Sequence, residues 1–119
     1  MKKRLSLYRM SEGTTIRFIE MYRSEECLWN SQHPDFRNKD ARLKAAEKIS
    51  ERINIAAFGP REVTKRFTKI RSSYCLELRK IGNSLKRGDT YKPKMPWFYA
   101  MDSFMKSMVH PKEMKLVRL

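Results

Sequence analysis

The chain has 119 residues, the length of one domain, and its 40% hydrophobic content is enough for one modest core. Its 27 lysines and arginines against 13 acidic residues give a formal net charge of +14, which favours a polyanionic partner. No stretch reaches the roughly 20 apolar residues of a membrane span, and two cysteines without neighbouring histidine or cysteine exclude a disulfide scaffold and a zinc site.

The first 13 residues are expected to form a basic arm that ends at Gly13. Lys2, Lys3 and Arg4 either contact phosphate and assist nuclear import, or belong to a disordered leader. Arg9 interrupts the segment before the apolar run of a signal peptide is reached, so secretion is not indicated.

A first helix is predicted from Thr14 or Thr15, either of which is a suitable cap, to about Ser24. Its inner stripe comprises Phe18, Ile19 and Tyr22. Leu28 and Trp29 follow in a short apolar segment. We expect both in the core, because a large indole is rarely left exposed without a ligand.

A loop over residues 31–38 separates this segment from a second helix, which is predicted from Lys39 or Asp40 to Ile53. His33 in the loop lacks the neighbours that a catalytic or metal-binding role would need. The inner face of the second helix is predicted to comprise Leu43, Ala46, Ile49 and Ile53.

A turn over residues 54–59 leads to Pro60, which suits the first position of a helix, and a third helix is predicted over 61–81. Its apolar residues recur at spacings of 4, 3, 4, 4 and 3, within an arc of roughly 80°. They are Val63, Phe67, Ile70, Tyr74, Leu78 and Ile81. A helix, a short turn and a basic helix in this order predict a helix-turn-helix.

The opposite arc of the third helix carries cations and short hydroxyls, which suit a groove of nucleic acid; the alternative is an ordinary solvated face. The arc comprises Lys65, Lys69, Ser72, Leu76 and Arg79, flanked by Arg66, Ser73 and Lys80. Leu76 either meets a thymine methyl group or marks a protein contact. Arg71, near the core stripe, is interpreted as a structural ion-pair partner, for example of Glu77 or of an acid on another helix. Residues 61–119 hold 15 of the 27 basic side chains and 5 of the 13 acidic ones, so the charge excess lies mostly in this half.

After Ile81 the pattern predicts a glycine-flanked loop over residues 82–89, in which Lys86 and Arg87 either contact phosphate or are simply mobile. Two prolines exclude a helix over 90–95, and Pro96 is expected to open a last helix. The stripe of this helix comprises Trp97, Met101, Phe104, Met105 and Met108. It either closes the bundle or serves as an exposed partner-binding helix.

Several blocks, taken together, resemble the MADF domain, a Myb/SANT-like domain, over roughly residues 15–108. They comprise residues 18–19 through 27–29, 33–40, Ile49, 67–78 and 91–98. The resemblance implies an all-α fold, with a Myb/SANT-like three-helix helix-turn-helix bundle and an additional C-terminal packing helix. It also implies that Trp29 and Phe67 belong to an aromatic core. Where the family often has tryptophan, this chain has Ala46 and Met95, so we expect the core to repack, for example with Phe58.

The resemblance further implies a DNA-binding domain of a nuclear transcription or chromatin regulator, with the helix from Arg61 in the major groove. We expect a helical domain over 14–108, between the arm 1–13 and a basic tail 109–119. The expected DNA contacts are Arg61, Lys65, Arg66, Lys69, Ser72, Ser73, Arg79, Lys80, Lys86 and Arg87. The expected core residues are Phe18, Leu28, Trp29, Ile49, Phe67, Ile70, Tyr74 and Trp97.

Double-stranded DNA is the expected partner, and affinity from phosphate contacts should fall with salt. The alternative is a protein-interaction module that docks to chromatin or transcription proteins or to a second copy of itself. RNA is a weaker variant, because no single-strand stacking motif is visible. Paired carboxylates, a phosphate loop, a nucleophile with its base and metal-ligand spacing are all missing from the sequence. We therefore expect no enzyme activity, cofactor, metal, membrane or small-molecule substrate.

Overall fold

A computed structural model describes residues 10–109, and over this range the chain is all-helical, without a strand. The elements are α2 (Glu12–Ser24), the 3-10 helix η1 (Glu26–Leu28), α3 (Lys39–Ile53), α4 (Pro60–Lys86), α5 (Pro96–Met105) and the 3-10 helix η2 (Lys106–Met108). The predicted all-α bundle with an additional C-terminal helix is confirmed. Most of the predicted basic arm and tail lies outside the described residues.

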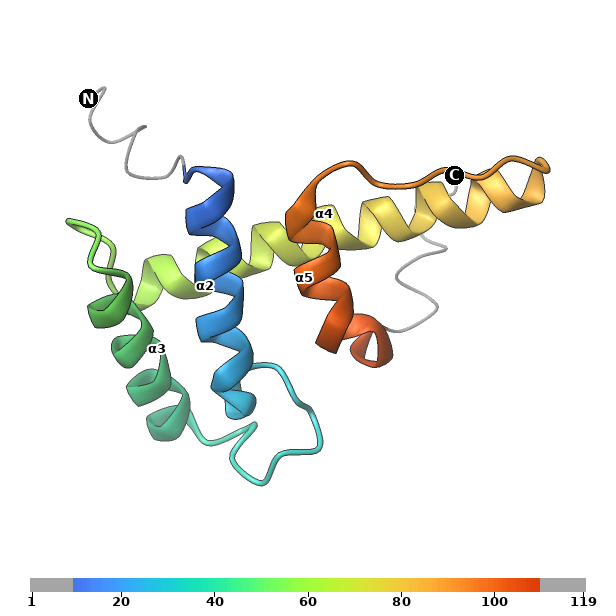
Figure 1. The fold of residues 1–119 in the computed structure, drawn as a ribbon. Coiled ribbons are helices and arrows are strands. Elements are labelled where there is room, and N and C mark those ends of the chain that lie inside the picture. Colours follow the sequence, from blue (N-terminus) through green and yellow to red (C-terminus); the bar gives the residue numbers. More distant parts are fainter. Residues whose placement is uncertain (1–9, 110–119) are drawn as a thin grey trace.

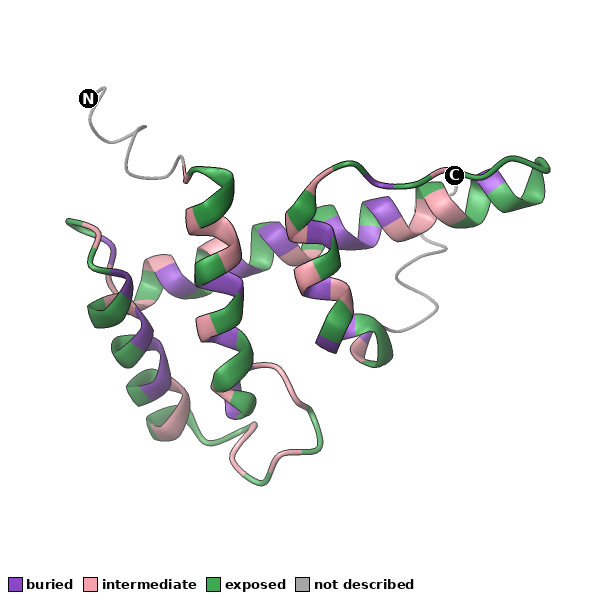
Figure 2. Cartoon of the chain, in the orientation of Figure 1, coloured by how far each residue is buried: buried purple, intermediate pink, exposed green. Residues whose placement is uncertain are grey.

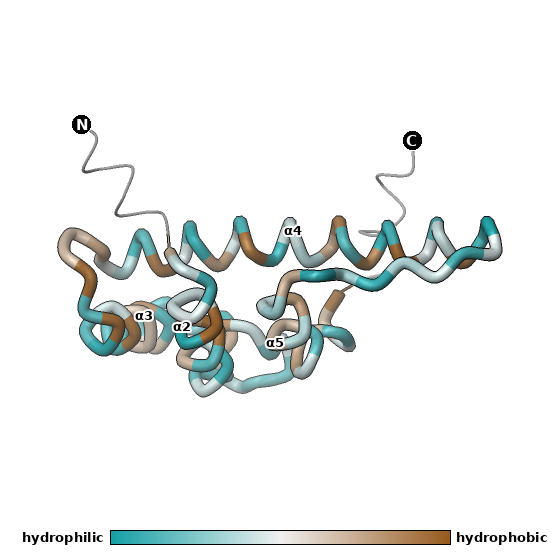
Figure 3. The backbone as a smooth tube through the Cα atoms, turned by 45° about the horizontal axis from the view of Figure 1, so that its top comes forward, coloured by the Kyte–Doolittle hydropathy of each residue, from teal (hydrophilic) through white to brown (hydrophobic). Residues whose placement is uncertain are grey.

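The helices form two layers (Figures 1 and 3). In one layer, α2 packs between α3 and α5, and in the other α4 runs across them, packed against both α3 and α5. The C-terminal part of α4 extends past α5, and the extended segment 88–95 runs back alongside it (Figure 1). One long side of α4 is therefore left uncovered by the three helices of the other layer.

The start of α2 differs from the sequence-based prediction. The helix begins at Glu12 rather than at Thr14 or Thr15, because Ser11 is the cap and its Oγ accepts a hydrogen bond of 3.1 Å from the Thr14 N–H. The predicted limits of α3 are confirmed. Asn38 caps this helix by accepting from the Ala41 N–H at 3.2 Å.

One predicted core position of α3 is wrong. Leu43 is 51% exposed, whereas Ala45 and Ala46 are buried. The neighbouring Arg42 faces η1 and the loop before α3, where its guanidinium donates to the carbonyl oxygens of Cys27 and Phe36 at 3.0 and 3.1 Å. These bonds tie α3 to η1 and to the loop that precedes it.

The long helix α4 begins as predicted, with Pro60 in its first turn and the Gly59 N–H donating to Glu62 Oε1 at 3.0 Å. Its predicted end at Ile81 is wrong, since the helix continues to Lys86 through the predicted loop. Gly82 costs an exposed helix only about 1 kcal/mol, whereas Ser84 is buried at 1% exposure and extends the packed face. The glycine that ends the helix is Gly88, whose φ of +83° suits a left-handed position.

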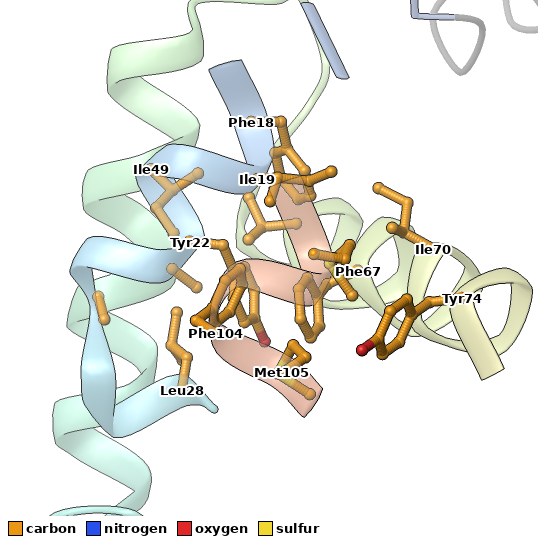
Figure 4. Packing of buried hydrophobic residues seen from close by; sticks show 14 of the residues in the cluster. Phe18, Ile19, Tyr22, Leu28, Ile49, Phe67, Ile70, Tyr74, Phe104 and Met105 are labelled. Atoms are coloured by element: carbon orange, nitrogen blue, oxygen red, sulfur yellow. The ribbon is translucent and has the colours of Figure 1, made fainter. Parts of the chain in front are cut away.

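Aromatic side chains join the two layers in the core (Figure 4). The rings of Tyr22 in α2 and Phe67 in α4 are stacked, with centroids 3.7 Å apart and an interplanar angle of 3°. Phe18 meets Phe58 edge-on at 6.1 Å. Of the predicted core residues, six are buried and Trp29 is half-buried; the six are Phe18, Leu28, Ile49, Phe67, Ile70 and Tyr74.

The remaining predicted core residue, Trp97, does not enter the core. Trp97 packs against its rim and is only half-buried, whereas the adjacent Phe98 is 3% exposed. The buried residues of α5 are Phe98, Met101, Phe104 and Met105, and Trp97, in the first turn of the helix, is left at the edge of the packed surface. The α5 stripe was therefore predicted one residue too early at its start.

A buried hydrogen bond joins α4 to α5, since the Tyr74 hydroxyl donates to Asp102 Oδ1 at 2.6 Å. Replacing Tyr74 with phenylalanine is expected to lower the free energy of unfolding by about 1.5–3 kcal/mol, the range for a hydrogen bond to a charged group. Urea denaturation measures the change. In an Asp102→Ala background the same substitution should cost little, and an equal loss in both backgrounds would show that this bond is not the cause.

Alkaline pH should weaken the fold through its buried phenols. Burial raises the pKa of Tyr22 to about 12, and burial together with the bond to Asp102 raises the pKa of Tyr74. Because the folded pKa values exceed the unfolded value near 10, the contribution is complete below about pH 10 and is lost as pH rises through the folded pKa. Between about pH 10 and 12, wild type should lose up to about 1.4 kcal/mol per pH unit more than Tyr22→Phe in urea denaturation. Parallel curves would contradict this.

Candidate nucleic-acid interface

The uncovered side of α4 carries an outer strip, which we define as Lys65, Lys69, Ser72 and Leu76. At 100° per residue these four share an arc of about 60°, opposite the buried Val63 and Tyr74. All four are exposed, and Arg61 is exposed at the N-terminal end of the strip. Figure 2 shows buried and exposed bands alternating along α4, as this arrangement requires.

The two carboxylates of α4 lie in different places: Glu77 is buried, whereas Glu62 lies beside the strip and lines a hollow with Lys65, Arg66 and Lys69. Glu62 accepts the Gly59 N–H in the first turn. Glu77 is 4% exposed and accepts from the Tyr91 hydroxyl at 2.6 Å and from Lys80 Nζ at 3.2 Å. The hydrogen bond with Glu77 also raises the pKa of Tyr91. The outer strip itself is a cationic surface with a single apolar member.

Beside the strip lies an open hollow of about 460 Å³. The described residues that line it come from the N-terminal ends of α2 and α5 and from α4: Met10, Glu12, Thr15, Arg66, Lys69, Ile70, Ser73 and Trp97. We call it the flank hollow. It contains two predicted DNA contacts, Arg66 and Ser73, and one member of the outer strip, Lys69.

Arg66 differs from the other cations of α4. It is half-buried, and its Nη2 atom is buried without a hydrogen-bond partner among the described residues. Burial lowers the pKa of this guanidinium from its ordinary value, although an arginine remains protonated at neutral pH. The side chain therefore places a positive charge in the flank hollow, and its Nη2 atom is available to donate a hydrogen bond.

The C-terminal cations of α4 form a second, separate group. Lys80 pairs with Glu77 and lies 5.8 Å from the centroid of the Tyr91 ring. Arg87 Nε is 3.6 Å from Asp89 Oδ2, Lys86 is exposed at the helix end, and Arg79 is half-buried. With a rise of 1.5 Å per residue, Lys86 lies about 30 Å along the axis from Lys65. The structure therefore does not bring all the predicted contact residues to one place.

Arg71 and His33, two further residues considered from the sequence, both make hydrogen bonds in the structure. The Nη2 atom of Arg71, a predicted ion-pair partner, lies 3.5 Å from the Met108 carbonyl oxygen, while Glu77 accepts from Tyr91 and Lys80. The His33 ring accepts the Asp35 N–H at 3.0 Å within its turn. Within residues 10–109, no cluster of three potential metal-binding side chains is found, and no helix is both long and apolar enough for a membrane span.

Trp97 is the residue of this surface that sequence reasoning missed. The sequence carried no clear signal for it, since adjacent helical residues can both be buried, as Phe104 and Met105 are. The packing of α5 buries Phe98 and leaves Trp97 at the border between α5 and α4, where it lines the flank hollow.

Comparison with known families gives one match that covers most of the chain. The family of MADF DNA-binding domains, described as "Alcohol dehydrogenase transcription factor Myb/SANT-like", matches residues 18–105. No curated protein and no solved structure matches the chain significantly. The matched range begins within α2 and ends with α5, so it includes the second half of α2 and all of α3, α4 and α5.

Proposed function

We propose that this chain, which belongs to the MADF family of Myb/SANT-like DNA-binding domains, binds double-stranded DNA through the outer strip of α4. The observation that carries the proposal is the exposed cationic strip on the uncovered side of the second helix of a helix-turn-helix, α3–α4. A rigid two-layer core holds this helix, and its uncovered side has the width of one helix face, which a major groove admits.

Within this proposal, the two groups of cations act differently. Lys65 and Lys69, near the N-terminal half of α4, read base edges, because lysine donates to the guanine acceptors of the major groove. Ser72 and Leu76 lie further along, where Leu76 can meet a thymine methyl group. Arg61 lies at the N-terminal end of the strip and is proposed as a flanking phosphate contact. Lys86 and Arg87 contact phosphates of a neighbouring stretch of the duplex.

The cellular role follows from the same premise. The family's description as a transcription factor supports regulation of transcription in the nucleus, and we propose this role for the domain over residues 14–108. This proposal assigns no enzyme activity to the domain. Random-duplex selection read by sequencing tests the specificity of the domain: a recurring motif would show base reading, and a flat outcome with retained low-salt binding would leave backbone contact only.

An electrophoretic mobility titration of a labelled duplex at two salt concentrations tests the binding itself. The affinity should fall steeply with salt, since each phosphate contact adds about 0.9 to the slope of log affinity against log salt concentration. A duplex that stays unbound at low salt would end the proposal. Binding that is insensitive to salt would mean that the cations of α4 are not its source.

A protein-docking role has less support in the structure. Four large apolar side chains of the described residues are exposed: Leu76 at 41% on the outer strip, Leu43 at 51% on α3, Leu85 at 63% at the far end of α4 and Tyr99 at 52% on α5. They are spread over three helices, whereas the cations of the proposed surface lie on α4. A stoichiometric partner, or a second copy of the chain, that remains bound in high salt would favour this role.

A further inference from the structure

The flank hollow combines a cation without a partner, a half-buried indole and an exposed hydroxyl beside the proposed DNA surface. Its wall from α4 supplies Arg66, Lys69, Ile70 and Ser73, and α5 supplies Trp97. These residues lie 20 to 30 positions apart in sequence and meet because the first turn of α5 packs against the middle of α4. Of these residues, only Ile70 is buried in the core.

The Arg66 guanidinium is the first sign of a missing ligand. Its Nη2 atom is shielded from solvent yet donates to no described residue, and no ion pair within 4.0 Å joins it to the nearby Glu12 or Glu62. A buried donor left unsatisfied destabilises the free protein. An anionic oxygen in the hollow would satisfy this donor, and guanidinium binds phosphate through paired hydrogen bonds.

Trp97 supplies the second feature of the hollow. The Trp29 N–H donates to the Arg23 carbonyl oxygen at 2.9 Å, whereas the Trp97 indole is half-buried at the rim of the core and lines the hollow. Its apolar face, together with Met10 and Ile70, offers a surface for a non-ionic part of a ligand next to the cations.

We propose that the flank hollow binds one backbone phosphate of a DNA strand together with its adjoining deoxyribose. Arg66 contacts the phosphate, Ser73 donates to it, and Trp97 packs against the sugar, while Lys69 at the border of the hollow keeps its role in the outer strip. This inference rests on the proposed function and extends it, because it fixes the register of the duplex through a contact outside the outer strip. Glu12 also lines the hollow, and its carboxylate opposes the bound anion.

Glu12 allows a test in which a substitution is expected to tighten duplex binding rather than weaken it. Glu12→Gln removes the opposing charge and should tighten duplex binding by about threefold, while Arg66→Gln should weaken it by about tenfold and lower the salt slope by about 1. Trp97→Ala should also weaken binding, by several-fold, without changing the salt slope, because an indole releases no counterion. Arg17→Gln is the matched control: this exposed cation lines a different hollow, between α2 and α3.

The test is a titration of each variant with a fluorescein-labelled duplex, with urea denaturation of each as a check on folding. Tryptophan emission gives a second readout, since duplex should change the emission of wild type but not of Trp97→Phe, which keeps Trp29. Inorganic phosphate alone should leave the emission unchanged at the same concentrations. If it changes the emission as the duplex does, the hollow is a site for free phosphate and the DNA-backbone assignment is wrong.

The outcomes separate this inference from the function on which it rests. If wild type binds the duplex but Arg66→Gln, Trp97→Ala and Glu12→Gln all behave as Arg17→Gln does, the flank hollow is not a binding site and the outer strip still is. If wild type does not bind, both proposals are lost. Should Arg66→Gln unfold, Glu12→Gln and Trp97→Ala decide the matter, because these residues lie at the surface and the rim of the core.

Discussion

Replacing Phe67 with alanine is expected to lower the free energy of unfolding by about 3–5 kcal/mol, a large part of the 5–15 kcal/mol typical of a domain. Phe67 is 5% exposed, and its ring is stacked on Tyr22 at 3.7 Å. Truncation removes both the burial of the ring and the stacking that joins α4 to α2, and it leaves a cavity between the two layers. Urea denaturation followed by far-ultraviolet circular dichroism measures the change.

Leu76→Ala is the control for this experiment, since it also truncates an apolar side chain of α4. Leu76 is 41% exposed, so its loss should change the free energy of unfolding by no more than about 0.5 kcal/mol. If Phe67→Ala costs as little as Leu76→Ala, the packing described here is not what holds α4 in place.

Reversing two charges of the outer strip, with Lys65→Glu and Lys69→Glu combined, is expected to reduce duplex binding by at least about 100-fold at moderate salt. Loss of each contact costs about 1–3 kcal/mol, and the new carboxylates add repulsion from the phosphates. The salt dependence of the remaining affinity should become shallower by about 2 in slope, because two fewer counterions are released. Fluorescence anisotropy of a labelled duplex gives both quantities.

The matched control reverses two cations on another surface. Arg17 and Arg52 are both exposed and line a hollow between α2 and α3 that contains no described residue of α4. The variant with Arg17→Glu and Arg52→Glu has the same net charge as the first, so any general loss of attraction is equal in both. Equal losses of affinity in the two variants would mean that total charge, and not the outer strip, determines binding.

Much of the fold could be predicted because its helices have strong periodic patterns. The stripe of α4 gave its orientation through Val63, Phe67, Ile70 and Tyr74, and all four are buried. Pro60 also marked the start of α4 correctly. The end of α4 could not be read in this way, because one glycine is a weak stop signal and a small polar residue such as Ser84 gives no indication in the sequence that it is buried.

The candidate site could be predicted from the sequence only where the position of a residue on a single helix determines whether its side chain is exposed. The outer strip follows directly from the 100° period of α4. The different environments of Arg66, Lys80 and Arg87 do not, because each depends on partners from elsewhere: the flank hollow, Glu77 with Tyr91, and Asp89. The half-buried position of Trp97 depends likewise on how α5 packs against α4, which its helical spacing to Met101 and Phe104 does not reveal.

The most direct test of the proposed interface is to map which residues of the wild-type chain respond to duplex DNA. At 119 residues, amide resonances can be followed in two-dimensional nuclear magnetic resonance spectra during a titration. The largest shifts should fall on Lys65, Lys69, Ser72 and Leu76. A duplex that binds while these four resonances stay unchanged, and that instead shifts Arg17, Arg52 or the loop over residues 31–38, would contradict the assignment of the outer strip as the DNA surface.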